Sequence, residues 1–288
     1  MPSLRANIYV APPIPFSGPN GKVRGHWSPI SSTLIHGEKE AVLVDTPITK
    51  AQNKDLADWV ERTIPTKKLI TLYITHGHAD HWLGIGYLQK RFPGLKAVAS
   101  RGTIEHMKEQ IEPNAFPAVW GERFQGQLDE DFVLAEPLPA NGEFHLEGCV
   151  LKAVEVGHSD THDSTVLWVP DIKLAVCGDV VYGDVHQMLA YAKTKELREE
   201  WIRAIEKVED LGPELVVAGH KKADELDGVF HLEASKQYIR DFGAFIEGGA
   251  KDARELGRLM LEKYPTRFNP GALYAGCMAA FPSKKASL

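Results

Sequence analysis

The 288-residue sequence lacks several features that would assign it to a special class of protein. Its three cysteines, Cys149, Cys177 and Cys277, form an odd and widely spaced set. We therefore expect reduced, mostly buried thiols rather than a disulfide framework, and hence a cytoplasmic protein. We see no apolar run long enough to span a bilayer and no apolar segment typical of a signal peptide near Met1. A membrane is not expected as a partner.

An excess of basic residues is also missing. The formal net charge is −6, and no long run of one sign occurs. A nucleic-acid partner would need a basic face, so none is expected. Hydrophobic residues make up 43% and charged residues 25%, which is ordinary for a globular enzyme. Without an internal repeat of 20–50 residues or a low-complexity linker, we predict one domain over residues 1–288 that acts on a small molecule.

Strand and helix patterns alternate in two blocks. Alternating or continuous apolar residues predict strands, and apolar residues spaced three to four apart predict helices. Each block of strands is followed by helices, which predicts two sheets packed face to face with helices outside. The predicted strands are 32–36, 41–45, 69–74, 96–99, 143–145, 150–156, 164–169, 173–177 and 214–218, and the predicted helices are 49–62, 82–91, 101–111, 196–211, 233–247 and 252–263.

Two segments lie outside this alternation. Prolines and glycines interrupt residues 112–142, where several aromatic side chains also occur, so we predict an aromatic loop insertion there. Residues 229–288 are predicted to form a helical extension that ends in a Pro/Gly-rich tail.

The densest chemical signal is Thr75-His76-Gly77-His78-Ala79-Asp80-His81. Four side chains that can bind a metal occupy six positions directly after an apolar strand. Burying three imidazoles and a carboxylate without partners is costly, whereas divalent ions such as zinc use them as ligands. In an extended chain His76 and His78 point the same way, and the following turn directs Asp80 and His81 elsewhere. The motif predicts a metal site.

Three more candidate ligands follow strands. His158, Asp179 and His220 each come after an apolar segment and a glycine. The glycine lets the backbone turn tightly, so that the next side chain projects toward a shared cleft. One such pattern is weak evidence, but three downstream of the histidine motif reinforce one another.

These motifs resemble those of the metallo-β-lactamase superfamily. The match runs from about Ser31 to Lys221 and includes Val44-Asp45-Thr46. It implies an α/β (α+β) fold, a four-layer αβ/βα sandwich of two mixed β-sheets with outer helices, and two divalent ions in a cleft at the sheet edges. Zinc is the first choice, with manganese or iron as alternatives. The resemblance assigns His76, His78 and His158 to metal 1, Asp80, His81 and His220 to metal 2, and Asp179 to both.

The same resemblance suggests the chemistry. A metal-bound water loses its proton near neutral pH and becomes the attacking hydroxide. Asp80 would bind metal 2 with one oxygen and orient the nucleophile with the other. Asp179-Val180-Val181-Tyr182 is similar to the Asp-x-x-Tyr of the lactone-hydrolysing branch, so Tyr182 would donate a hydrogen bond to the developing oxyanion. Alternatively, Tyr182 packs beneath the cleft. In the superfamily, the first class of antibiotic-hydrolysing enzymes uses a cysteine as metal ligand at the position where this chain has Asp179.

Three side chains are candidates for substrate binding. Trp120 and Phe124 lie in the insertion and would line an apolar pocket, or else attach the loop to the body. His186 follows Tyr182 and faces either the substrate or solvent. Asp45 is interpreted as a buried acceptor that braces the ligand loops, and His162 as a neighbour that hydrogen-bonds a ligand.

The leading functional hypothesis is a dinuclear hydrolase that opens a cyclic amide or ester, a lactamase or lactonase. Thioester hydrolysis of the glyoxalase II kind is the alternative, although residues 225–288 show no matching basic pattern. An iron-dependent persulfide dioxygenase is less favoured because such enzymes use fewer metal-2 ligands. A superfamily member kept only as a scaffold would normally have lost metal ligands. This sequence has all of them, so a scaffold role is not favoured.

Overall fold

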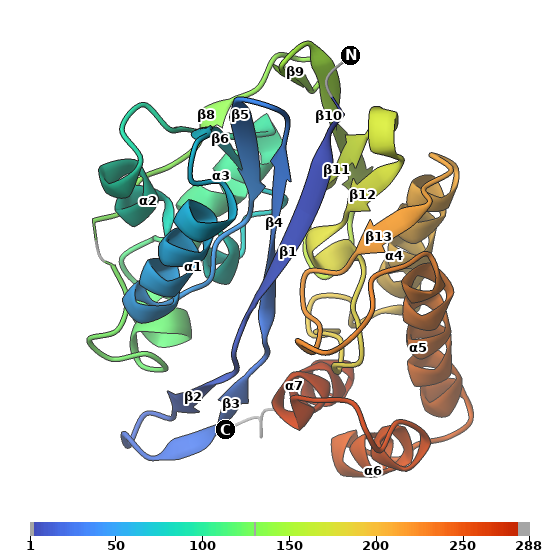
Figure 1. Cartoon of the computed structure of the whole chain (residues 1–288). Helices are drawn as coiled ribbons and strands as arrows, with labels where there is room; N and C mark the ends of the chain where they lie inside the picture. The colour runs from blue at the N-terminus through green and yellow to red at the C-terminus, as the bar shows by residue number, and fades with distance from the viewer. Residues whose placement is uncertain (1–2, 130, 282–288) are drawn as a thin grey trace.

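The computed structural model describes residues 3–129 and 131–281 and contains two mixed sheets that face each other (Figure 1). The first sheet has the order β1-β4-β5-β6-β7-β8, and the second has the order β13-β12-β11-β10-β9. A separate hairpin joins β2 (Ile14–Ser17) to β3 (Val23–Trp27). The first sheet comprises β1 (Arg5–Ala11), β4 (Ile30–His36), β5 (Glu40–Val44), β6 (Lys68–Tyr73), β7 (Lys96–Ala99) and β8 (Glu136–Pro137). The second comprises β9 (Glu143–Leu146), β10 (Cys149–Gly157), β11 (Ser164–Val169), β12 (Leu174–Val176) and β13 (Leu215–Val217).

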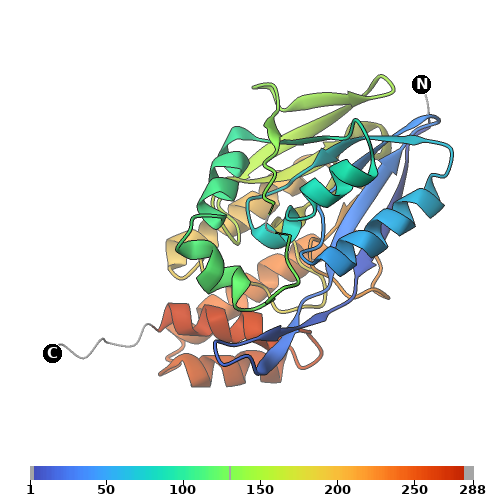
Figure 2. The same cartoon turned by 90° about the vertical axis from the view of Figure 1, so that its left-hand side faces the viewer.

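Helices cover the outer face of each sheet. The first sheet is covered by α1 (Lys50–Thr63), α2 (Ile85–Arg91) and α3 (Arg101–Gln110), and the second by α4 (Lys195–Glu209) and α5 (Phe230–Glu247) (Figure 1). Two further helices, α6 (Ala253–Lys263) and α7 (Pro270–Ala280), lie across one end of the molecule beside the β2–β3 hairpin (Figure 2). None of the helices within residues 3–129 and 131–281 combines the length and apolar character needed to cross a bilayer.

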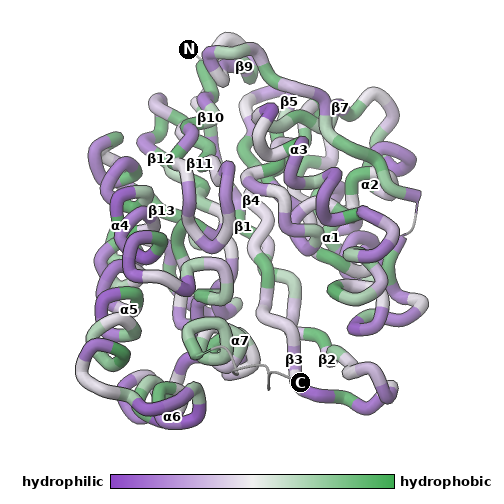
Figure 3. Tube along the Cα trace, turned by 180° about the vertical axis from the view of Figure 1, so that it is seen from behind, coloured by the Kyte–Doolittle hydropathy of each residue, from purple (hydrophilic) through white to green (hydrophobic). Residues whose placement is uncertain are grey.

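Three apolar layers hold this arrangement together. One layer, which includes Leu56 and Trp82, lies between the first sheet and α1–α3. A second, which includes Trp201 and Phe242, lies between the second sheet and its helices. The third layer, which includes Tyr73, lies between the two facing sheets. Hydrophobic segments follow the strands, and hydrophilic ones are frequent on the outer helices (Figure 3). The predicted four-layer sandwich is confirmed.

The strand ends position the candidate ligands. Parallel pairing of β5 with β6 places Val44 beside Tyr73, so that Asp45 and the histidine motif leave the first sheet together. Parallel pairing of β12 with β13 does the same for the segments that carry Asp179 and His220. The turn between β10 and β11 approaches the same edge, since the Thr165 N–H donates to the Thr75 carbonyl at 3.0 Å.

The structure differs from the sequence-based elements mainly at the two ends of the chain. Strands β1–β3 were not predicted because the proline pair Pro12-Pro13 reads as an interruption. Helix α7 occupies the segment predicted to be a tail. Its start is explained by Asn269, whose side chain accepts the Ala272 N–H, and by Pro270 in the first turn, where a missing N–H costs nothing. Within 112–142, residues Pro117–Gly121 form a π-helical turn and 136–137 form β8.

Candidate metal centre

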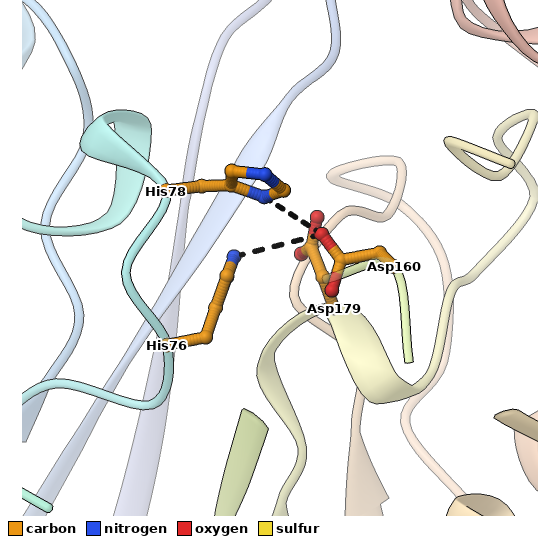
Figure 4. A group of neighbouring side chains, drawn as sticks. All are labelled: His76, His78, Asp160 and Asp179. Carbon is orange, nitrogen blue, oxygen red and sulfur yellow. Dashed lines mark ion pairs between the residues drawn. The ribbon is translucent and has the colours of Figure 1, made fainter. Parts of the chain in front are cut away.

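A first group of buried side chains converges between the two sheets. It joins His76 and His78, after β6, to Asp160 in the β10–β11 turn and Asp179 after β12, with candidate ligand atoms within 4.8 Å of one another. His78 Nδ1 lies 2.7 Å from Asp160 Oδ2, and His76 Nε2 lies 3.8 Å from the same oxygen (Figure 4). All four side chains point toward one small volume, which is the arrangement a bound cation requires.

A second group lies directly beside the first. Asp80, His81 and His220 also bring candidate ligand atoms within 4.8 Å of one another. Asp179 connects the two groups, because its Oδ1 lies 3.2 Å from His81 Nε2 and its Oδ2 lies 3.3 Å from His220 Nε2. Asp179 therefore lies between the two groups, and its bridging role stays a prediction.

Asp45 braces the histidine motif from behind. It accepts the Thr75 N–H at 2.9 Å and the Thr75 hydroxyl at 2.7 Å, and it lies 3.0 Å from His81 Nδ1. The Thr75 hydroxyl in turn lies 3.0 Å from His76 Nδ1. A carboxylate that contacts the outer nitrogen of an imidazole fixes the ring's orientation and leaves the other nitrogen for a metal. After β13, on the side of the second sheet, His220 Nδ1 lies 2.9 Å from the Pro29 carbonyl.

Two glycines leave the room that this packing needs. At Gly219, a Cβ atom would collide with Asp179 Oδ1. At Gly178 the backbone φ is +49°, and a Cβ atom would collide with the Thr75 hydroxyl. The glycines before Asp179 and His220 therefore permit both a turn and the close approach of neighbouring ligand segments.

The centre has a strongly negative potential. Burial opposes protonation of His220, but the Asp179 carboxylate raises the pKa of this imidazole to about 10. Burial likewise opposes protonation of His81, yet Asp179 and Asp45 hold its pKa well above the ordinary value. Burial and the nearby His81 keep the pKa of His76 well below its ordinary value. Buried carboxylates that favour positively charged imidazoles also favour metal cations.

The donor set fits divalent metal ions. Imidazole nitrogens and carboxylate oxygens suit zinc and related first-row metals. His76 Nε2 is buried and makes no hydrogen bond within the described part of the chain, so it offers a free lone pair to a ligand site. Six of the seven predicted ligands, His76, His78, Asp80, His81, Asp179 and His220, fall into these adjacent groups.

The seventh predicted ligand, His158, stays a prediction, since its buried Nε2 makes no hydrogen bond within the described residues. The structure leaves it out of the ligand groups found among the described residues and puts Asp160, two positions later, beside His76 and His78. The strand pattern ends at Gly157, but the chain continues through a turn before a side chain reaches the centre. Asp160 is fully buried, and Ser159 donates a hydrogen bond to its Oδ1 at 3.0 Å. Asp160 is therefore a further candidate ligand, which the sequence analysis did not name.

A cleft opens above the centre. Its cavity volume is about 170 Å³, which limits a ligand held there to a small molecule. His78, Asp80, Asp160, Asp179 and His220 line its floor. Its walls are mostly apolar and include Trp27, Val119, Trp120, Met188, Tyr191, Ala272 and Ala275.

Trp27 connects a wall of the cleft to its floor. Its indole N–H donates to Asp80 Oδ2 at 2.8 Å, and its ring packs edge-on against Trp120, with centroids 5.4 Å apart. The sequence analysis did not identify Trp27, which lies on the unpredicted strand β3. This hydrogen bond fixes the rotamer of Asp80. The Oδ1 atom of the same carboxylate does not take part in it and can accept a proton or a hydrogen bond.

Three of the other predicted site residues line the cleft, and one does not. Tyr182, Trp120 and His186 line the cleft, whereas Phe124 is fully buried and packs on Trp27 with ring centroids 5.7 Å apart. Phe124 is therefore placed behind the wall rather than on it. His186 Nδ1 lies 2.8 Å from the Tyr238 hydroxyl, while its buried Nε2 has no hydrogen-bond partner in the described residues.

His162 was predicted to hydrogen-bond a metal ligand, but its hydrogen bonds within the described residues go elsewhere. Its exposed ring lies 2.7 Å from Asp163 Oδ2 and 3.3 Å from Glu109 Oε2, and its centroid lies 4.4 Å from that of the tilted His106 ring. The buried His106 separates it from His78, since the His106 and His78 ring centroids are 5.3 Å apart. His162 therefore belongs to an outer layer of the site.

Comparisons with known proteins agree with this geometry. A family model described as the metallo-beta-lactamase superfamily matches residues 25–220. The chain belongs to that superfamily. It is 24% identical over 222 residues to a type 2 metallo-beta-lactamase of Bacteroides fragilis, covering 74% of this chain and 76% of that protein. It is 26% identical over 216 residues to a type 2 metallo-beta-lactamase of Bacillus sp. (strain 170), covering 73% and 74%.

Solved structures of superfamily members have the same fold. A metallo-beta-lactamase family protein from Thermus thermophilus aligns with a TM-score of 0.63 at 19% identity, covering 95% of this chain and 91% of that one. A metallo-beta-lactamase from Pontibacter korlensis aligns with a TM-score of 0.55 at 18% identity, covering 83% and 100%. Membership, the fold and the His/Asp groups together identify a hydrolase of this superfamily with a candidate metal site.

Proposed function

We propose that this protein is a dinuclear metal-dependent hydrolase that opens a cyclic amide or ester of a small organic molecule. The observation that supports it most is the joining of two buried ligand groups by Asp179 at the floor of a cleft. When bound, a pair of divalent ions, zinc in our proposal, would supply a nucleophile at neutral pH and polarise the substrate carbonyl. His76, His78 and Asp160 would hold one ion, Asp80, His81 and His220 the other, and Asp179 both.

Asp80 is the group best placed to move a proton. Its Oδ2 accepts the Trp27 indole N–H at 2.8 Å and lies 3.6 Å from His220 Nε2. Burial alone would raise the pKa of Asp80, but contact with His220 and His81 lowers it, so the carboxylate is ionised near neutral pH. An ionised carboxylate with one oxygen fixed can take a proton on the other and return it to the leaving group.

Tyr182 is the second catalytic candidate. Burial and the Asp179 carboxylate hold the pKa of its phenol well above the ordinary value, so it is a neutral donor. The hydroxyl donates to Asp179 Oδ2 at 2.5 Å in this structure and lines the cleft. We propose that it turns from Asp179 toward the carbonyl oxygen as negative charge develops there, which is the role of an oxyanion donor.

The walls support a small, partly apolar substrate. Trp27 and Trp120 form one side, and Met188 and Tyr191 supply further apolar surface. Such walls exclude water from the reacting bond and strengthen the electrostatic interactions on the floor.

A substrate panel tests the proposal. Protein loaded with zinc, manganese or iron would be assayed with lactones, lactams and thioesters, and its metal content measured before each assay. We expect ring opening of a lactone or lactam that Asp80→Asn suppresses, with two ions per chain. Turnover of thioesters alone would favour the glyoxalase II-like alternative, and one iron with oxygen consumption would favour the persulfide dioxygenase.

A further inference from the structure

Arg123 holds a fixed place in the wall of the cleft. It follows the π-helical turn Pro117–Gly121, and its backbone N–H donates to the Trp120 carbonyl at 3.1 Å. Its own carbonyl accepts the Ser17 N–H of β2 at 3.0 Å. The backbone is thus tied on both sides, and the half-buried side chain lines the cleft.

The guanidinium of Arg123 has few protein partners. It donates to the Val119 carbonyl, and no carboxylate lies within ion-pair distance of it in the described residues. Guanidinium has five N–H donors, so most of its hydrogen-bonding capacity is left over. Burial is the main cause that lowers the pKa of Arg123, and the charges of Tyr191 and Glu122 offset this effect only in part.

Two other arginines show what a structural role looks like in this protein. Arg198 donates to the Ala192 and Lys193 carbonyls and lies 5.9 Å from the Phe242 ring centroid. Arg267 donates to the Gly183 and Val185 carbonyls and lies over the Tyr238 ring at 4.6 Å. Each has two carbonyl acceptors and an aromatic ring, and neither lines the cleft. Arg123, in contrast, has one carbonyl acceptor, that of Val119, and its side chain lines the cleft.

Charge within the cleft makes Arg123 distinctive. Among the described residues that line it, Arg123 is the single arginine or lysine, and the acidic residues lie on the floor within the metal centre. A substrate anion entering this negatively charged protein therefore finds one cationic side chain apart from the reacting bond.

We infer that Arg123 binds a carboxylate of the substrate, and that the substrate is a monoanion whose carboxylate is separate from the amide or ester to be cleaved. A planar guanidinium pairs with a carboxylate through two parallel hydrogen bonds. One cation matches one negative charge, and the aromatic walls match an apolar body between the carboxylate and the scissile bond. The inference rests on the proposed function for the position of the reacting bond.

Paired substrates test this inference. A lactone or lactam that bears a carboxylate would be compared with the same compound as its primary carboxamide, using zinc-loaded wild type and Arg123→Met. A lost charge-assisted pair predicts a ~10- to 100-fold lower kcat/KM for the acid. We expect less than a ~2-fold change for the carboxamide. Arg123→Lys should restore part of the preference, and Arg24→Met, an exposed arginine outside the cleft, should leave it unchanged.

A binding experiment separates this inference from the catalytic proposal. Phenylacetate and phenylacetamide would be titrated into the same zinc-loaded proteins by calorimetry. We expect wild type to prefer the acid by ~10-fold or more, and Arg123→Met to lose that part of the preference. Preference for the acid without hydrolysis of any lactone or lactam would overturn the proposed function alone. Ring opening with a preference that survives Arg123→Met and Arg123→Gln would overturn the inference alone.

Discussion

The phenolic oxygen of Tyr182 lies 2.5 Å from Oδ2 of Asp179 and donates a hydrogen bond to it. The Tyr182 ring also stacks on His220, with centroids 5.7 Å apart and an interplanar angle of 25°. The phenol is therefore tied to a carboxylate that lies between the two ligand groups. Effects of Tyr182 on the reaction and on metal affinity can be separated by measurement.

We predict that Tyr182→Phe lowers kcat and kcat/KM together by ~10-fold or more, because an oxyanion donor acts only in the transition state. An amide should be affected more than an ester, since its nitrogen is the poorer leaving group. Steady-state kinetics at measured zinc content checks this. A change confined to KM, or a loss explained by missing zinc, would reduce Tyr182 to a packing residue or a support for Asp179.

Asp179→Ala should weaken both metal sites, because this carboxylate approaches His81 on one oxygen and His220 on the other. We expect fewer than two tightly bound ions per chain, measured by elemental analysis after dialysis against a weak chelator. Asp163→Ala, which removes an exposed carboxylate, is the matched control. Two ions retained at full affinity in Asp179→Ala would contradict the bridging role.

Asp160 and His158 give opposite predictions for one site. The structure places Asp160 at 2.7 Å from His78, so Asp160→Ala should lower metal affinity, whereas His158→Ala should change it little. The two variants would be titrated with zinc in parallel, and melting temperatures without metal would control for folding. If His158→Ala loses the ion and Asp160→Ala keeps it, the sequence-based assignment is right and the β10–β11 turn rearranges on binding.

For Asp80→Asn, kcat should fall by at least ~10²-fold, the usual scale for a lost acid or base. Trp27→Phe keeps the ring and removes the indole N–H that fixes Asp80 Oδ2. It should reduce kcat less, on the order of 10-fold, because the carboxylate remains but its orientation is looser. Near-normal turnover by Asp80→Asn with both ions bound would show that Asp80 is structural.

His186 should make stability depend on acid pH. Burial first, and then the positive charge of Arg267, lowers the pKa of His186 to about 4, below the ordinary 6.5. Between these two pH values the His186 imidazole is protonated in the unfolded chain and neutral in the folded chain. The stabilising contribution is therefore complete above pH 6.5 and is lost as pH falls toward 4. His186→Gln should reduce the slope of unfolding free energy against pH by up to ~1.4 kcal/mol per unit.

Urea titrations of wild type and His186→Gln across this pH range measure the difference. Loss of bound metal in acid adds the same slope to both proteins and cancels in the comparison. Equal slopes for the two proteins would mean that His186 is protonated in the folded state.

Much of the sandwich follows from local patterns. The strand 96–99 was predicted with its observed bounds, and the hairpin of β4 and β5 forms where alternating residues predict it. The elements that were missed depend on distant contacts. Strand β1 exists because β4 pairs with it from Arg5 to Ala11, and Asn269 caps α7 in a positive-φ conformation beside Ser28. Residue spacing along the chain does not report such partners.

The site was predictable to the extent that its ligands follow strands directly. His76, Asp179 and His220 leave strand ends with little intervening chain, so their convergence follows from the sheet edge. Asp160 sits inside a turn whose path depends on contacts such as Ser159 to Ser164 at 2.8 Å, and these could not be foreseen. Trp27 and Arg123 reach the cleft from unpredicted or irregular segments.

The ligand groups draw on both halves of the chain, with His76 and His78 from the first sheet's side and Asp160 and Asp179 from the second. An ion held there would fasten the two halves of the sandwich together from within. Binding to the folded state alone raises stability with metal concentration and lengthens the time before the molecule opens. Metal starvation would then expose the chain to proteases, so that the amount of protein in a cell, as well as its turnover, would follow the metal supply.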